Sequence, residues 1–247
     1  MKWIPMLIAA GLLMNAALAR ASDGHAWQYS GEDGPAHWGN LTPAFALCKL
    51  GKEQSPVDIR SAHAAKLDPI VFNYHASQLD IVNNGHTIQA NPADAGTIRL
   101  AGHDYKLVQF HFHAPSEMEI DGKRFPLVLH LVHQDASGRL AVVALLFTLG
   151  QENRTLKPLF ENMPAKVGET KALPAHVNLA DLLPAKRGYF TFTGSLTTPP
   201  CSEGVRWLVL EQPVTLSSRQ LEAFRKLYPM NARPIQPLNG RQIQVTD

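Results

Sequence analysis

The amino-acid sequence predicts a mainly β (α+β) fold: one domain with a large, mostly antiparallel, twisted central sheet and short peripheral helices. Segments rich in β-branched and aromatic residues recur along the chain. Turn signals such as Asn84-Gly85, Asp121-Gly122 and Ser137-Gly138 separate them, and only one stretch has a strong helical pattern. The 247 residues contain no internal repeat, low-complexity run or linker, which favours a single domain.

The elements differ in how clearly the sequence defines them. The N-terminal third, up to about residue 60, is turn-rich and is expected to be irregular. Residues 140–147 are apolar throughout, as expected of a strand covered on both faces. Ser217 and Gln220 form a capping box that starts the helix, and Pro229 ends it. The expected strands are Leu79–Val82, Thr97–Leu100, Tyr105–His113, Leu127–His133, Leu140–Phe147, Gly188–Thr193 and Val205–Leu210.

The first residues have the pattern of a secretory signal peptide. Met1-Lys2 is a short positive start, and Trp3–Leu18 is nearly all apolar. Ala17-Leu18-Ala19 and Ala19-Arg20-Ala21 both offer a cleavage site. We expect a signal peptide over residues 1–19, cleaved after residue 19 or 21, because the segment is too short and wrongly flanked for a membrane span. The mature protein is then periplasmic or secreted, with no membrane attachment.

The net charge limits the kinds of partner that the protein can have, and the two cysteines predict a disulfide. The formal net charge is only +2, with acidic and basic residues interspersed, which argues against a nucleic-acid or membrane-surface partner. Two cysteines, Cys48 and Cys201, occur in an apparently exported chain, where an even pair is a disulfide candidate. The alternative is two buried free thiols. A bridge across so much sequence would stabilise the fold by about 4–5 kcal/mol in the chain-entropy model.

A histidine pattern provides the strongest functional prediction. His111 and His113 are two residues apart in an expected strand, so both project from one face. Gln109 shares that face and can accept the outer ring N–H of one of them. A third histidine from a neighbouring strand would complete a three-histidine metal site with one open position, which is typical of catalytic zinc. His130 and His133 point opposite ways, and the spacing alone does not choose between them.

Further polar groups occur where packing does not require them. Asn83-Asn84-Gly85-His86 is a turn that presents one histidine, and residues 194–200 place hydroxyls before a Pro-Pro pair. Taken alone, the first is an exposed turn histidine and the second an ordinary loop with Ser/Thr–backbone hydrogen bonds. Gly34–Gly39 and Glu53–Ile59 are weak motifs individually.

Together these segments resemble the alpha-class carbonic anhydrases of the bacterial exported type, over a domain spanning residues 24–245. The resemblance implies a Zn²⁺ cofactor held by His111, His113 and His130. It implies that Thr197 accepts a hydrogen bond from zinc-bound hydroxide and donates its own to Glu117. The implied reaction is the reversible hydration of carbon dioxide to bicarbonate and a proton.

The resemblance assigns roles to other residues as well. His86 falls at the position of the proton shuttle, and Tyr29 at that of a tyrosine that orders active-site water. Cys48 and Cys201 match the disulfide of the bacterial members. The residues expected to contact substrate are an apolar wall and two hydroxyls: Val132, Val142, Leu196, Val205, Trp207, Thr197 and Thr198.

Two positions depart from the family pattern. Val128 stands where the family usually has a glutamate bonded to the outer nitrogen of His130, and such partners commonly matter by about 10–100-fold. We therefore expect weaker zinc retention than is usual for the family. Met118 replaces a frequent buried histidine, which is expected to change the packing behind Glu117 rather than the chemistry.

Two other functions are compatible with parts of the pattern. His111, His113 and Glu117 also fit the ligand spacing of a cupin-like metal-dependent oxidase or isomerase, with iron or manganese as the metal. A non-catalytic binding domain of the same fold is the second alternative. The expected partner is a small-molecule substrate, carbon dioxide or bicarbonate, and the sequence allows a homodimer.

Overall fold

A 13-stranded mixed sheet forms the centre of the fold in this computed structural model, which describes residues 26–247. Strands β8 (His103–His113), β11 (Leu127–Gln134) and β12 (Leu140–Leu149) are neighbours in the middle of the sheet. Both pairs are antiparallel, so β8 and β12 run in one direction and β11 runs in the opposite direction. Parallel pairs occur as well, including the one between β12 and β16 (Glu203–Leu210). The predicted large, mostly antiparallel sheet is confirmed.

The other strands extend the sheet on both sides or form small separate sheets. The further strands of the large sheet are β2 (His63–Ala65), β3 (Val71–Tyr74), β5 (Leu79–Asn83), β6 (Ile88–Pro92), β7 (Gly96–Leu100), β13 (Thr170–Ala172), β15 (Tyr189–Ser195), β17 (Val214–Leu216) and β18 (Gln244–Thr246). The small sheets contain β1 (Asp58–Ile59), β9 (Glu119–Ile120) and β10 (Lys123–Arg124), and β4 (Ala76–Ser77) with β14 (Val177–Asn178).

The central strands are buried on both faces. Alternate residues of β12 face two different clusters: Val143 and Leu145 belong to the larger one, while Val142 and Ala144 belong to the smaller one. This arrangement confirms the strand predicted from the uninterrupted apolar run. Of the β8 side chains, Phe110 and Phe112 lie in the larger cluster, so the opposite face of that strand is left for the histidines.

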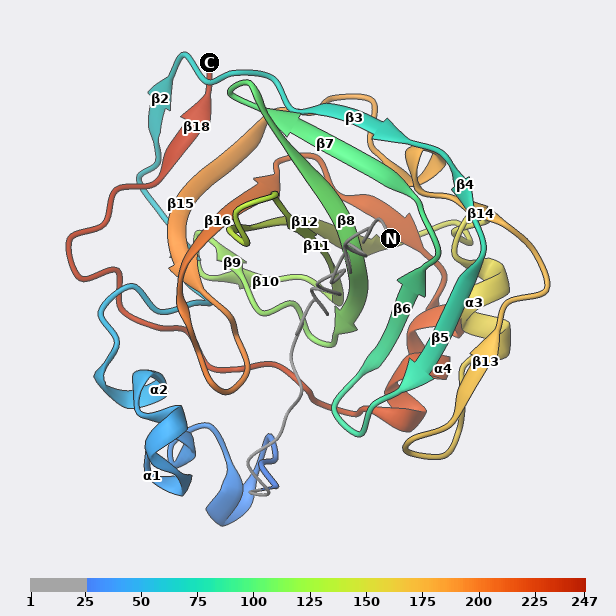
Figure 1. Cartoon of the computed structure of the whole chain (residues 1–247), viewed down its shortest axis with the longest axis horizontal. Helices are drawn as coiled ribbons and strands as arrows, with labels where there is room; N and C mark the ends of the chain where they lie inside the picture. The colour runs from blue at the N-terminus through green and yellow to red at the C-terminus, as the bar shows by residue number, and fades with distance from the viewer. Residues whose placement is uncertain (1–25) are drawn as a thin grey trace, which may run out of the picture.

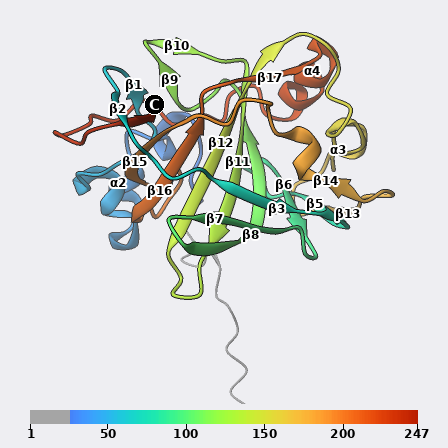
Figure 2. The same cartoon turned by 90° about the horizontal axis from the view of Figure 1, so that it is seen from above.

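Short helices lie around the sheet. The predicted capping box is present, because Ser217 and Gln220 exchange hydrogen bonds at the start of α4 (Ser218–Leu227). Leu221 and Phe224 are the buried apolar residues that pack α4 against the larger cluster. Figures 1 and 2 show α4 and α3 (Lys157–Asn162) on one side of the molecule, with α1 (Trp38–Leu41) and α2 (Leu47–Leu50) on the other.

The N-terminal segment is irregular, as predicted, with α1, α2 and the 3₁₀ turns Gly31–Asp33 and Pro43–Phe45. Cys48 of α2 forms a disulfide with Cys201, which lies between β15 and β16. The predicted disulfide is confirmed, and the alternative of two free thiols is wrong. A third 3₁₀ turn, Leu179–Leu182, precedes β15.

The expected signal peptide over residues 1–19 lies outside the described residues. Within residues 26–247, no helix combines the length and the apolar character needed to cross a membrane.

Candidate metal centre

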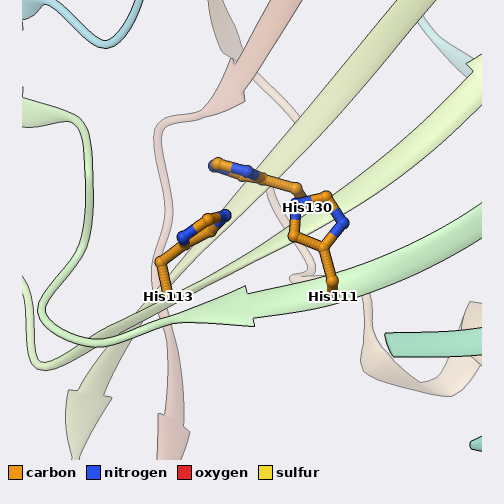
Figure 3. Close-up of side chains that lie close together, drawn as sticks. All are labelled: His111, His113 and His130. Atoms are coloured by element: carbon orange, nitrogen blue, oxygen red, sulfur yellow. The ribbon is translucent and has the colours of Figure 1, made fainter. Parts of the chain in front are cut away.

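Three histidine side chains converge on one point, as Figure 3 shows. His111 and His113 project from β8, and His130 projects from β11, directly opposite His111 in the strand register. Each offers a ring nitrogen, and these nitrogens all lie within 4.8 Å of one another. The structure thus selects His130 for the cluster. His133 points to the other face, where its Nε2 is 2.7 Å from the Tyr74 hydroxyl.

Metal ligation requires neutral imidazole rings. Burial, and then the neighbouring His113, holds the pKa of His111 well below its usual range. Burial also lowers the pKa of His130 strongly, with the other two rings adding to the effect. His113 and His130 are almost fully buried, while His111 is partly exposed, so solvent reaches the cluster from one side.

In two of the rings, the nitrogen that points away from the cluster (the outer nitrogen) has a hydrogen-bond acceptor. The nitrogen that points into the cluster (the inner nitrogen) is therefore free to bind a metal. His111 Nδ1 donates to Gln109 Oε1 at 2.8 Å, the bond expected from their spacing. His113 Nδ1 donates to the backbone carbonyl of Asn231 at 2.7 Å. Each acceptor fixes the tautomer, so Nε2 of both rings is available as a ligand. Nε2 of His113 is buried with no hydrogen-bond partner among residues 26–247, which is the state of a ligand atom facing a metal position.

Glu117 lies beside the cluster rather than in it. Its Oε2 is 3.5 Å from His113 Nε2 and 3.8 Å from His130 Nδ1, and its Oε1 accepts the backbone N–H of Arg233 at 2.9 Å. Among the described residues, the group that can hold a metal comprises the three histidines without Glu117. A cupin-like set with Glu117 on the metal is therefore not favoured.

Opposing effects act on the Glu117 carboxyl. Complete burial raises its pKa, while His113, the Thr197 hydroxyl and Arg233 each lower it. The Arg233 guanidinium is itself buried and donates to Gln54 Oε1 and to the carbonyls of Ser55 and Cys48. Burial lowers the pKa of the Arg233 guanidinium to about 10, and the nearby Glu117 carboxyl opposes this shift. Within the described chain, the guanidinium has no carboxylate partner in direct contact.

An apolar surface adjoins the histidines. His130 packs edge to face on the indole of Trp207, with ring centroids 4.9 Å apart. The expected wall residues lie together in the smaller cluster: Val132, Val142, Val205 and Trp207 are buried, and Leu196 is partly buried against them. Thr197 and Thr198 follow Leu196 in the loop after β15, and Thr197 is almost fully buried.

The expected proton-transfer residues lie near the N-terminal segment. His86 stacks face to face on Trp27, with ring centroids 3.6 Å apart and planes at 7°. Tyr29 lies against Trp27 as well, and its buried hydroxyl has no partner among residues 26–247. Burial, and then Glu117, holds the pKa of the Tyr29 hydroxyl well above its usual range.

No pattern in the sequence predicts a role in the site for three residues of this region: Asn231, Arg233 and Trp27. Asn231 and Arg233 lie in a stretch without helix or strand, and neither belongs to a periodic pattern. For Arg233, the sequence offers one signal: Pro229 and Pro234 lie close by and predict a segment without helix or strand.

The comparison with known proteins agrees with this geometry. The eukaryotic-type carbonic anhydrase family matches residues 33–247. A carbonic anhydrase of Pectobacterium carotovorum is 49% identical over 226 residues, which cover 91% of this chain and 93% of that protein.

Solved structures are similar over nearly the same range. The alpha-carbonic anhydrase of Thermovibrio ammonificans, in complex with sulfanilamide, is 45% identical with a TM-score of 0.87, covering 91% of this chain and all of that chain. The alpha-carbonic anhydrase of Photobacterium profundum is 46% identical with a TM-score of 0.84, covering 90% of this chain and all of that chain. The sheet, the three-histidine cluster and these similarities lead to one assignment: the chain belongs to the eukaryotic-type, or alpha-class, carbonic anhydrase family.

Proposed function

We propose that this protein catalyses the reversible hydration of carbon dioxide to bicarbonate and a proton, with zinc held by His111, His113 and His130. One observation carries the proposal: three ring nitrogens lie within 4.8 Å of one another beside an apolar wall, in a chain of this family. Three neutral nitrogen donors suit zinc and leave one coordination position open. When bound, zinc acts as a Lewis acid that brings a coordinated water to a pKa near 7, a value established for carbonic anhydrase itself.

Glu117 and Thr197 orient the attacking group. An ionised carboxylate only accepts hydrogen bonds, so the Thr197 hydroxyl donates to Glu117. The Thr197 oxygen can then only accept a hydrogen bond from the attacking group on the metal side. This fixes the orientation of the attacking group, so that one of its lone pairs faces the substrate. The burial of Glu117 and the effect of Thr197 on its pKa support this pairing.

The apolar wall receives the substrate. Carbon dioxide has no net charge, so it loses little hydration when it lies against Val132, Val142 and Trp207. The same side chains exclude water from the path of attack. Leu196, Val205 and Thr198 complete the proposed contact surface.

His86 carries the released proton to buffer, and Tyr29 orders the water between. Burial lowers the pKa of His86 and thus favours the neutral ring, which is the form that can accept a proton. Its Nδ1 is buried without a partner among the described residues, which leaves it available for a bridging water.

We further propose that residues 1–19 are a signal peptide and that the domain of residues 24–245 acts in the periplasm or outside the cell. The Cys48–Cys201 disulfide supports an oxidising compartment. Light scattering on the purified mature chain distinguishes a monomer from a homodimer.

The test is a stopped-flow carbon dioxide hydration assay on the mature protein, before and after chelation and after zinc is added back. We expect about one zinc per chain, activity that disappears with the metal, and recovery with zinc. A protein with iron or manganese and no hydration would favour the cupin-like alternative. A protein that holds zinc but has no hydration activity would indicate the non-catalytic binding domain.

A further inference from the structure

The outer nitrogen of His130 lacks the hydrogen bond that the other two rings have. Its Nδ1 lies toward the cluster, 3.8 Å from Glu117 Oε2, so Nε2 is the outer nitrogen. Nε2 is buried with no hydrogen-bond partner in residues 26–247. A neutral imidazole that ligates through Nδ1 carries its hydrogen on Nε2. The ring therefore holds a buried donor without an acceptor.

Val128 occupies the position from which an acceptor would reach this nitrogen. On β8, Gln109 stands two residues before His111 on the same face and accepts from its outer nitrogen. On β11, Val128 stands in the same relation to His130, because strand side chains alternate. Val128 is completely buried, and its side chain has no atom that can accept a hydrogen bond.

The other groups near His130 do not replace the missing acceptor. Val128 belongs to the apolar cluster that also contains Val57 and Met118. Trp207 meets the His130 ring edge to face. An aromatic ring accepts an N–H only weakly compared with a carboxylate or an amide oxygen.

We propose that Val128 makes this centre release zinc faster than the same centre with an acceptor at position 128. The proposal rests on the proposed function, because it takes the three histidines as zinc ligands. An acceptor on the outer nitrogen holds the ring in its ligating orientation and increases the basicity of the ligand. Its absence commonly lowers metal affinity by about 10–100-fold.

The test measures the transfer of zinc from the holoenzyme to a chromophoric chelator, independently of catalysis. We expect Val128→Glu to slow the release of zinc by about 10–100-fold, and Val128→Gln to slow it by a smaller factor. Leu129→Gln is the matched control, because it buries an amide at the next residue, on the opposite face of β11. It is expected to leave zinc release no slower than in the wild type.

A second variant examines the same effect in the opposite direction. Gln109→Leu removes the acceptor of His111, and zinc release is expected to become faster by about 10-fold or more. If folded Val128→Glu and Val128→Gln both release zinc at the wild-type rate, the proposal is wrong. An unchanged rate in Gln109→Leu would also contradict it, because outer-nitrogen acceptors would then not govern zinc release.

If neither Val128 variant folds, the wild type still provides a test. In ¹⁵N-labelled holoenzyme, the exchangeable imidazole N–H of His130 is expected upfield of those of His111 and His113, because it is not hydrogen-bonded. An equally downfield resonance for His130 would overturn the proposal. The zinc content and carbon dioxide hydration of the same preparation test the proposed function separately. An active zinc enzyme whose release rate is unaffected by position 128 would contradict this inference alone.

Discussion

His86 is held by one aromatic contact. Its ring lies parallel to the indole of Trp27, which covers one face of the imidazole and leaves the ring edge for hydrogen bonding. Asn231 anchors the backbone at this point, because its Nδ2 donates to the carbonyl of His86 at 3.0 Å. The backbone carbonyl of Asn231 is also the acceptor of His113, one of the proposed zinc ligands. One residue thus links the proposed proton shuttle to the metal centre.

The proposed role of His86 leads to a specific kinetic prediction. In His86→Ala, turnover in weak buffer is expected to fall by about 100-fold or more, because a positioned group for proton transfer is lost. Added imidazole is expected to restore turnover, and kcat/KM for carbon dioxide is expected to change little. The measurement is stopped-flow hydration at several buffer concentrations. If imidazole fails to restore turnover, the proton leaves by another route.

At the scale of elements, the register between β8 and β11 assembles the site. His130 pairs directly with His111, and Val128 pairs with His113. Since strand side chains alternate, a shift of one residue would move His130 to the opposite face of the sheet. The large apolar surfaces on both faces of β11 and β12 specify this register, so the core determines where the ligands meet.

The Cys48–Cys201 disulfide joins α2 to the loop that follows Thr197. It spans 153 residues of sequence, so its removal greatly increases the freedom of the unfolded chain. We expect the Cys48→Ser, Cys201→Ser double variant to lose about 2–5 kcal/mol of unfolding free energy. For a chain of this length, the loss corresponds to a Tm lower by about 5–20 °C.

Calorimetry of the zinc-loaded protein measures this effect. Reductant should lower the Tm of the wild type toward that of the double variant and leave the variant unchanged. Equal Tm values for the wild type and the variant would show that the bridge does not stabilise the folded state.

At the scale of the whole molecule, the two faces of the sheet bury histidines with different roles. The face toward the smaller cluster carries the metal centre. The other face buries His133, whose two ring nitrogens are both hydrogen-bonded within the protein. Its Nδ1 donates to the carbonyl of Ala141, and its Nε2 accepts from the Tyr74 hydroxyl. The hydrogen bond to Tyr74 connects β11 with β3 through the larger core.

This second histidine makes stability depend on pH. Burial lowers the pKa of His133 from its ordinary value of 6.5 to about 3. Between these values the unfolded chain binds a proton that the folded chain does not, so stability falls as the pH decreases from about 6.5 toward about 3. Above pH 6.5 the contribution of His133 is complete and constant.

The prediction is tested by urea unfolding of the wild type and His133→Gln at several pH values from 7.5 to 4.5. The two curves of stability against pH should converge as the pH falls, because the variant lacks this titration while both proteins share the remaining groups. Parallel curves would show that His133 is not responsible for the acid sensitivity.

Much of this arrangement could be predicted from the sequence because it depends on local geometry. The alternation of strand side chains puts His111, His113 and Gln109 on one face, whatever the rest of the chain does. The capping box of α4 also involves neighbours only a few residues apart. Spacing alone does not choose between His130 and His133; the family resemblance selects His130, and the strand register agrees with it.

The sequence by itself determined the mainly β fold, the paired histidines, the cysteine pair and the family. Only the tertiary structure decided what surrounds the ligands: Asn231 as the acceptor of His113, Trp27 against His86, and an outer nitrogen of His130 left without a partner. The physical reason is distance along the chain. The His113 hydrogen bond joins residues 118 apart, and no periodicity encodes such a contact. Packing of the whole sheet and its irregular C-terminal segment brings these groups together.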